Sequence, residues 1–149
     1  MVLNISEAEW EVMRVVWSNI DTTSKIVINT LSFKKGWSVS TIKTLLSRLV
    51  EKNMLNTRKQ GNKFIYNAVY SENDCLESIT REFLSKICAR KTGLIMEIII
   101  NEDRLNVEDI DNIISRLKEK KKTAKKIIEC NCVKGQCTCH NNGQCICHR

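Results

Sequence analysis

Residues 37–50 read WSVSTIKTLLSRLV, and they carry the clearest structural signal in the chain. Ser38 can cap a helix here, because its hydroxyl accepts a hydrogen bond from the free N–H groups of a first turn. Apolar side chains recur with helical spacing on one face, at Ile42, Leu45, Leu46, Leu49 and Val50. Short hydroxyls and cations fill the opposite face, at Ser40, Thr41, Lys43, Thr44, Ser47 and Arg48. The pattern predicts a helix that is buried on one side and offers hydrogen-bond donors and positive charge on the other.

Two helices are expected before this one. Ser6 and Glu9 have the spacing of a capping box, in which each side chain accepts a hydrogen bond from the backbone N–H of the other residue. The apolar face of this first helix should contain Trp10, Met13, Trp17 and Ile20. Residues 21–24 offer caps for a second, short helix, and the run Lys34-Lys35-Gly36 should end it.

After the third helix the pattern changes from helical to extended. Residues 54–70 contain one arm, a turn at Gly61, and a second arm rich in aromatic and β-branched residues. Glycine allows the positive φ angle that a tight hairpin turn needs. The segment is therefore predicted to be a two-stranded β-hairpin, and its basic tip contains Arg58, Lys59 and Lys63.

Three helices followed by a basic hairpin are typical of a winged helix-turn-helix, and we assign residues 1–70 to such a DNA-binding domain. The third helix would enter the major groove, where all four base pairs can be distinguished. Its N-terminus can also face a phosphate. The predicted DNA contacts are Ser38, Ser40, Thr41, Lys43, Thr44, Ser47, Arg48, Arg58, Lys59 and Lys63. The alternative is an ordinary amphipathic helix with a solvated polar face.

The composition agrees with a nucleic-acid partner. The 149 residues carry 24 Lys and Arg against 17 Asp and Glu, a net charge of +7, and 10 of the cations against 5 of the acids lie in residues 1–70. No apolar run approaches the roughly 20 residues of a membrane span. The first residues lack the basic start and apolar stretch of a signal peptide, so we expect a cytoplasmic protein. No catalytic arrangement stands out, and an enzyme is not expected.

Helical spacing returns after residue 70. Ser71 and Asn106 can each cap a helix, and Gly93 should interrupt the helical run between them. Residues 94–100 are apolar almost all round and must be buried against something. The other apolar faces contain Leu76, Ile79, Phe83, Ile87, Ile110, Ile113, Ile114 and Leu117. These faces exceed what three short helices need to pack on themselves, so residues 71–127 are predicted to be a helical dimerisation domain.

Six of the eight cysteines lie between Cys130 and Cys147, in a tail that we take as residues 128–149. Residues 130–139 have the form C-x-C-x-x-x-x-C-x-C, whose four thiolates can close a tetrahedral zinc site. The close C-x-C spacing also suits copper(I), a soft ion that accepts two or three sulfurs. The predicted metal ligands are Cys130, Cys132, Cys137 and Cys139, with Cys145 and Cys147 as further candidates.

Four residues with metal-binding or thiol chemistry stand outside this set. His140 and His148 each follow a cysteine pair, and we leave them out of the core site. Cys75 neighbours an apolar stripe and is interpreted as a small buried core residue. Cys88 lies on the helical segment after the hairpin, and the sequence does not assign it a role.

Several of these stretches together resemble the penicillinase-repressor family of bacterial transcription repressors. They are Ala8-Glu9-Trp10-Glu11-Val12-Met13, the later Trp17, and residues 37–49, and the resemblance continues to about Leu117. The family, also known as BlaI/MecI/CopY, contains beta-lactam-responsive repressors and copper-responsive CopY-type repressors. The resemblance implies a winged helix, a helical dimerisation domain and binding of a homodimer to an inverted-repeat operator.

Two features separate the chain from the beta-lactam branch of this family. That branch is inactivated by proteolysis at an Asn–Phe bond, and the matching place here is Ile98–Ile99. It also lacks a cysteine tail, whereas residues 130–139 match the tail of the CopY-type repressors. The resemblance therefore implies that a zinc-loaded repressor holds DNA and that cuprous ions displace zinc to derepress copper-export genes.

Two other functions remain open at this point. A metal-buffering protein or metallochaperone would explain the cysteines but would leave the winged helix without a purpose. A thiol-redox regulator would use the C-x-C pairs as disulfides, although such pairs close small, strained rings. The leading hypothesis is a copper-responsive, DNA-binding homodimer with zinc and copper(I) as its metals.

Overall fold

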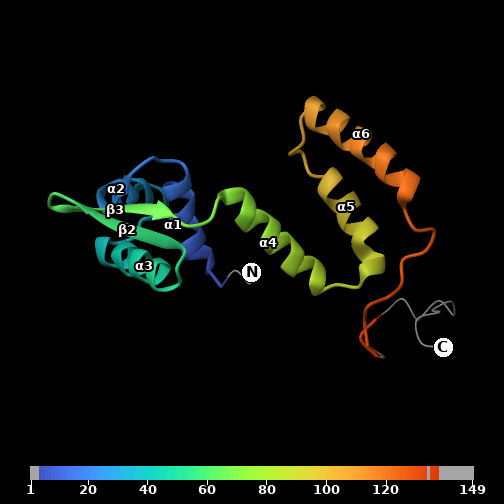
Figure 1. Cartoon of the computed structure of the whole chain (residues 1–149), viewed down its shortest axis with the longest axis horizontal. Coiled ribbons are helices and arrows are strands. Elements are labelled where there is room, and N and C mark those ends of the chain that lie inside the picture. Colours follow the sequence, from blue (N-terminus) through green and yellow to red (C-terminus); the bar gives the residue numbers. More distant parts are fainter. Residues whose placement is uncertain (1–3, 134, 138–149) are drawn as a thin grey trace. The chain divides into compact units, whose positions relative to one another are not determined.

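The computed structural model describes residues 4–133 and 135–137, and it is mainly helical with one small sheet, as predicted (Figure 1). The elements in chain order are α1 (Glu7–Trp17), β1 (Thr22–Thr23), α2 (Ser24–Lys35), α3 (Val39–Glu51), β2 (Leu55–Gln60), β3 (Lys63–Ala68), α4 (Glu72–Ser85), the 3-10 turn η1 (Ala89–Lys91), α5 (Thr92–Ile100) and α6 (Val107–Thr123). The chain divides into two compact units, an N-terminal unit (Met1–Thr80) and a C-terminal unit (Arg81–Arg149).

The core of the N-terminal unit lies where α1, α2 and α3 meet. It is built from apolar side chains of these three helices, and it buries Val12, Met13, Val27, Leu31, Ile42, Leu46 and Leu49. The caps also form as predicted: Ser6 and Glu9 make a capping box on α1, and Ser38 accepts from the backbone N–H of Thr41 at the start of α3. Burial on one face and capping at the N-terminus together place the polar face of α3 in solvent.

The sheet has three strands, in the order β1-β3-β2, and all its pairs are antiparallel. The predicted hairpin forms β2 and β3, and Gly61 makes the turn at a φ angle of +59°. The third strand was not predicted: Thr22 and Thr23 of β1 pair with Tyr66 and Ile65 of β3. This third strand ties the connection between α1 and α2 to the base of the hairpin.

The first helix ends earlier than its apolar spacing predicts. Side chains close its last turn, because Ser18 Oγ donates to the carbonyl of Arg14 and Asn19 Nδ2 donates to the carbonyl of Val15. Ile20 therefore lies beyond α1 and is 95% exposed, so its predicted place on the buried face was wrong. Trp17 keeps its place, and its indole Nε1 donates to the carbonyl of Tyr70 over 2.9 Å.

The helical run after the hairpin breaks at residues 86–91 rather than at Gly93. α4 ends at Ser85, Cys88 precedes η1, and Gly93 lies in the first turn of α5. The predicted break at Gly93 was therefore wrong by a few residues. Cys75, on the first turns of α4, is completely buried in the core of the N-terminal unit, as predicted.

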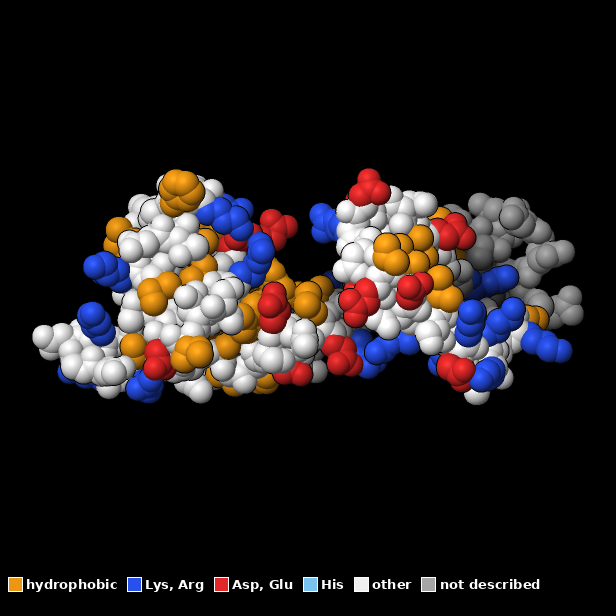
Figure 2. All heavy atoms as spheres, turned by 90° about the horizontal axis from the view of Figure 1, so that it is seen from above, with side chains coloured by type: hydrophobic (Ala, Val, Ile, Leu, Met, Phe, Trp, Pro, Cys, Tyr) orange, Lys and Arg blue, Asp and Glu red, His pale blue; other side chains and the backbone are white. Residues whose placement is uncertain are grey.

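The helices of the C-terminal unit keep apolar side chains at the surface of the single chain. Neither α5 nor α6 buries a residue. The expectation that residues 94–100 are buried is not met within one chain, where Leu94 and Ile98 are about half exposed. Figure 2 shows hydrophobic side chains of this part of the molecule at the surface, bordered by acidic ones. Among the described residues, no helix combines the length and apolar content needed to cross a bilayer.

Candidate nucleic-acid interface and candidate metal centre

The polar face of α3 forms the first candidate site. All its predicted DNA contacts are exposed, namely Ser38, Ser40, Thr41, Lys43, Thr44, Ser47 and Arg48. The hydroxyls near the helix start bond one another, because Ser38 Oγ lies 3.1 Å from Ser40 Oγ and 2.9 Å from Thr41 Oγ1. Within the described part of the chain, Lys43 and Arg48 form no ion pair. This face therefore presents free positive charge beside hydrogen-bonding groups.

The hairpin supplies the other predicted cations, and they differ in their surroundings. Lys59 and Lys63 are exposed near the Gly61 turn. Arg58 is also exposed, but its Nη2 donates to Asp21 Oδ1 over 2.6 Å. Arg58 thus shares its charge with the turn after α1, whereas the two lysines point their charge at solvent.

A buried carboxylate joins α1 to the end of α3. Glu9 is 2% exposed, and its Oε2 accepts from Lys52 Nζ and from the backbone N–H of Ser6, each over 2.7 Å. Burial opposes its ionisation, but the Lys52 ammonium and the Ser6 N–H together lower the pKa of Glu9 below its ordinary value. Lys52 is the C-cap of α3, so this ion pair helps to set the position of that helix. The sequence showed Glu9 only as a capping residue.

The second candidate site is a cluster of four thiols in the C-terminal unit, which we call the cysteine cluster. It contains Cys88, Cys130, Cys132 and Cys137, whose sulfur atoms all lie within 4.8 Å of one another. Three of the four predicted metal ligands therefore meet. The fourth, Cys139, lies outside the described residues, as do Cys145, Cys147, His140 and His148.

Local hydrogen bonds shape the segment that carries these cysteines. The backbone N–H of Cys132 donates to Cys130 Sγ over 3.4 Å. Gly135 has a φ angle of +90°, which side chains disfavour, and it lies inside the turn that is closed by the N–H of Gln136 donating to the carbonyl of Val133. The turn brings Cys137 back to the pair at Cys130 and Cys132.

Cys88 belongs to the cluster although it lies 42 residues before Cys130. Its thiol donates to Cys130 Sγ over 3.5 Å, and it is 6% exposed. Next to it, the backbone N–H of Ala89 donates to Asn131 Oδ1 over 2.8 Å. The sequence left Cys88 unassigned because nothing in its local pattern points to a partner so distant along the chain.

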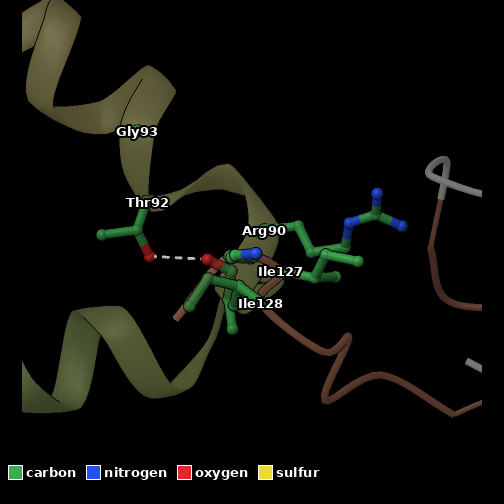
Figure 3. Close-up of a pocket in the computed structure, with 7 residues that line it drawn as sticks. Arg90, Thr92, Gly93, Ile127 and Ile128 are labelled. Atoms are coloured by element: carbon green, nitrogen blue, oxygen red, sulfur yellow. Dashed lines mark hydrogen bonds between the residues drawn. The ribbon is translucent and has the colours of Figure 1, made fainter. Parts of the chain in front are cut away.

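Residues 126–128, which lead into the tail, also line a shallow depression of about 330 Å³ (Figure 3). Residues from η1 and α5 form the rest of its lining, which in full is Ala89, Arg90, Thr92, Gly93, Lys126, Ile127 and Ile128. Thr92 Oγ1 donates to the carbonyl of Ala89 over 2.8 Å and fixes the start of α5 beside it. The tail thus lies against η1 at several residues before it reaches the cysteines.

The pKa values of the two C-x-C thiols, Cys130 and Cys132, are shifted in opposite directions. The backbone N–H of Cys132 stabilises the thiolate of Cys130 and lowers the pKa of Cys130. Desolvation, with the neighbouring thiols, raises the pKa of Cys132 to about 12. Neighbouring thiolates repel one another, so each thiol opposes the ionisation of the next. A bound cation would offset this electrostatic repulsion.

The donor set fits a thiophilic metal ion. A tetrahedral zinc site with bonds of about 2.3 Å places its sulfurs about 3.8 Å apart, and the cluster spans no more than 4.8 Å. The described cysteines form no disulfide, and the 3.5 Å between the Cys88 and Cys130 sulfurs exceeds a covalent S–S bond of about 2.05 Å. Four thiolates suit zinc as a closed site and copper(I) as a soft ion.

Comparisons with known proteins match nearly the whole sequence. The family model described as penicillinase repressor matches residues 5–144. A penicillinase repressor of Bacillus licheniformis is 34% identical over 121 residues, which cover 81% of this chain and 94% of that protein. An uncharacterised 16.5 kDa protein from the ptsI 3' region of Latilactobacillus sakei is 37% identical over 135 residues, 91% of this chain and 92% of that one. The solved B. licheniformis BlaI monomer in complex with the blaP half-operator is 40% identical, with 50% of this chain and 90% of that chain covered at a TM-score of 0.45.

Proposed function

The chain belongs to the penicillinase repressor family and is a DNA-binding transcriptional repressor, and from this premise we propose that it is a metal-responsive one. In this proposal a zinc-loaded homodimer binds an inverted-repeat operator. Exchange of zinc for copper(I) in the tail releases the DNA and derepresses copper-export genes. The observation that carries the proposal is the cysteine cluster, a four-thiol site in a repressor whose N-terminal unit exposes a basic helix.

The DNA contacts in this proposal are those of α3 and the hairpin. Lys43 and Arg48 lie on the exposed face of α3, where cations can reach base edges or phosphates. Lys59 and Lys63 would contact the backbone beside the groove, and Arg58 would do so by leaving Asp21. The sequence similarity to the penicillinase repressor of B. licheniformis, 34% identical over 121 residues, supports this assignment.

The dimer in this proposal forms through the C-terminal unit. Apolar side chains of α5 and α6 are exposed in the single chain, among them Leu94, Ile98 and Leu117. Burying such faces against a second copy removes them from water. A two-fold dimer also matches the symmetry of an inverted repeat, and it doubles the number of base pairs that one winged helix reads.

The metals in this proposal follow from ligand chemistry. Four thiolates complete a closed tetrahedral zinc site. Copper(I) prefers soft sulfur ligands and accepts fewer of them, so exchange would change both the number and the arrangement of bound thiolates. The proposed ligands are Cys130, Cys132 and Cys137, which meet in the cysteine cluster. The sequence motif offers Cys139 as a candidate fourth ligand, and Cys145 and Cys147 are candidates for a further site.

An operator titration tests the metal response. The chain is titrated onto its own promoter fragment with zinc and then with cuprous ion, under reducing conditions throughout. We expect zinc to support binding and copper to abolish it. The double variant Cys130→Ser/Cys132→Ser should lose the copper response, whereas Cys75→Ala, whose sulfur lies in the other unit, should keep it. Wild-type repression with wild-type copper release in the double variant would contradict the proposal.

The same titration separates the two alternative functions. A metal buffer would bind both ions without any change in operator affinity. A thiol-redox regulator would release DNA on addition of an oxidant and would ignore copper while a reductant is present.

The DNA face is tested with Arg48→Ala and Lys43→Ala. Each should cost about 1–3 kcal/mol of operator affinity where a base is contacted, and less where only a phosphate is. Lys118→Ala, a cation on α6, is the control and should bind as the wild type does. Unchanged affinity in both single variants and in their double variant would place the DNA contact elsewhere.

A further inference from the structure

The position of Cys88 in the cysteine cluster points beyond the tail. Cys88 follows the end of α4 at Ser85 and directly precedes η1. It is thus supplied by the helical part of the C-terminal unit, whereas Cys130, Cys132 and Cys137 come from the tail. We propose that Cys88 is a ligand of the regulatory metal, so that one thiolate from the α4–α5 junction and three from the tail hold a single ion. This inference rests on the metal-responsive function proposed above and names a ligand of that site.

Hydrogen bonding holds the tail at this junction independently of its sulfur atoms. The Asn131 side chain lies between the two cysteines of the C-x-C pair and accepts from the backbone N–H of Ala89 over 2.8 Å. Residues 126–128 line a depression together with Arg90, Thr92 and Gly93. Cys130 therefore lies beside Cys88 because the segment around it packs against η1 and α5. This packing adds the thiol of Cys88 to the three thiols of the tail.

The surroundings of Cys88 favour a ligand over an inert core residue. Cys75 shows the contrast, since it is packed into the apolar core formed by α1, α2 and α3. Cys88 is also buried, but its sulfur lies 3.5 Å from that of Cys130 and within 4.8 Å of the cluster's other two sulfurs. A small apolar side chain would satisfy a core position, whereas three converging thiols leave the fourth corner of a tetrahedron to Cys88.

Ligation by Cys88 would connect the metal to the helices. A site made of tail cysteines alone fixes only the tail. With Cys88 included, the metal fixes the residues between α4 and α5, because Cys88 lies three residues after the end of one helix and four before the start of the other. Loss of one ligand on exchange to a metal of lower coordination number would then release this junction from the tail.

Cobalt(II) titration of the full chain under anaerobic, reducing conditions tests the proposal. Cobalt substitutes for zinc, and its sulfur-to-metal charge-transfer absorption grows with the number of bound thiolates. We expect one cobalt ion per chain with the spectrum of a tetrahedral four-sulfur site. Cys88→Ser should lose about a quarter of the charge-transfer intensity, since three of four thiolates remain, and should weaken cobalt binding at least about 10-fold, the low end of losses seen even for outer-shell changes.

Two further variants make the result decisive. Cys139→Ser removes the ligand that the ten-residue motif predicts in place of Cys88, and it should keep the full intensity. Cys88→His offers a nitrogen ligand at the same position, so it should restore tight binding with a blue-shifted spectrum. Far-UV circular dichroism of each variant confirms that its helices are formed.

The outcomes distinguish this inference from the function on which it rests. A four-sulfur spectrum that survives in Cys88→Ser and is lost in Cys139→Ser would overturn the role of Cys88 and leave the metal-responsive function intact. A wild-type chain that binds no cobalt would remove both. A loss of tight cobalt binding in Cys88→Ser that Cys88→His does not restore would mean that position 88 only supports the fold.

Discussion

The two units of this repressor hold themselves together by different means. The N-terminal unit encloses a core in which residues such as Met13, Leu31 and Ile42 are at most 1% exposed. In the described part of the C-terminal unit, Cys88 is the only buried residue. The first unit can stabilise itself by burying apolar surface. The second leaves its apolar surface exposed in one chain, so in the proposed function a partner chain and a bound metal supply its stability.

The difference begins in the sequence patterns of the helices. In the N-terminal unit, α3 is apolar on one face only, and that face meets α1 and α2. In the C-terminal unit, α5 is apolar almost all round over residues 94–100, and no single neighbour can cover such a helix. A helix of that kind is stable only when it is surrounded. The contrast leads to four predictions, in order of expected effect.

Removing a core side chain should destabilise the N-terminal unit at any protein concentration. Leu31→Ala should lower its free energy of unfolding by about 2–5 kcal/mol, because it removes most of a buried leucine side chain and leaves a cavity. Urea unfolding followed by tryptophan fluorescence measures this, since all three tryptophans, Trp10, Trp17 and Trp37, lie in the N-terminal unit. The contrasting variant is Leu117→Ala on α6, whose cost, followed by circular dichroism at 222 nm, should grow with protein concentration. A concentration-independent cost in Leu117→Ala would contradict the assignment of that face to a dimer.

Placing a charge on α5 should prevent dimerisation. Ile98→Asp puts a carboxylate into a surface that the dimer would desolvate, and sedimentation velocity at micromolar concentration should show a monomer. Operator affinity should fall by about 100-fold or more with the loss of paired binding. Ile20→Asp adds the same charge at an exposed apolar residue of the N-terminal unit and should sediment as the wild type does. A dimeric Ile98→Asp would show that the chains pair elsewhere.

Removing the metal should destabilise one unit and leave the other unchanged. A metal present at about 100 times its Kd contributes about 2.7 kcal/mol to the state that binds it. Chelation should therefore lower the melting temperature of the C-terminal helices by about 10 °C or more, measured by circular dichroism at 222 nm. The melting of the N-terminal unit, measured by tryptophan fluorescence, should not move. Cys130→Ser/Cys132→Ser is the control and should not respond to the chelator; equal shifts in both signals would show that the units unfold together.

Acid should weaken the N-terminal unit through Glu9. The folded state lowers the pKa of Glu9 below 4.5, so the ionised Glu9 adds stability above about pH 4.5 that is lost as the pH falls through the lower, folded value. Glu9→Gln keeps a capping side chain but loses the charge opposite Lys52. We expect it to cost about 1 kcal/mol at pH 7 and to flatten the stability profile as the pH falls below about 4.5. Glu7→Gln, an exposed neighbour, should leave the profile as it is; an unaltered profile in Glu9→Gln would rule out this role.

Local chemistry explains which parts of the structure could be predicted. The starts of α1, α3 and α6 depend on a capping residue and a partner three positions later, and all three were found from the sequence. The hairpin turn at Gly61 is local in the same way. The end of α1 was missed although it is local, because apolar spacing continued to Ile20 while Ser18 and Asn19 closed the helix before it.

Contacts between distant parts of the chain explain the rest. β1 is two threonines long, and only its pairing with β3, more than 40 residues away, makes it a strand. Cys88 is the corresponding case in the candidate metal centre. Spacing within residues 130–139 predicted Cys130, Cys132 and Cys137, but it could not predict a thiol that only folding brings to them.

A metal held by both Cys88 and Cys130 would close a ring around the two helices that carry the exposed apolar faces. The two cysteines are 42 residues apart, and α5 and α6 lie between them. Closing the ring and pairing two chains would order the same segment, so each process would reduce the entropy cost of the other. By thermodynamic reciprocity, the metal would tighten the dimer by the same factor by which the dimer tightens the metal. Dilution would then release metal, and the threshold at which this repressor senses its ion would depend on how many copies of it a cell contains.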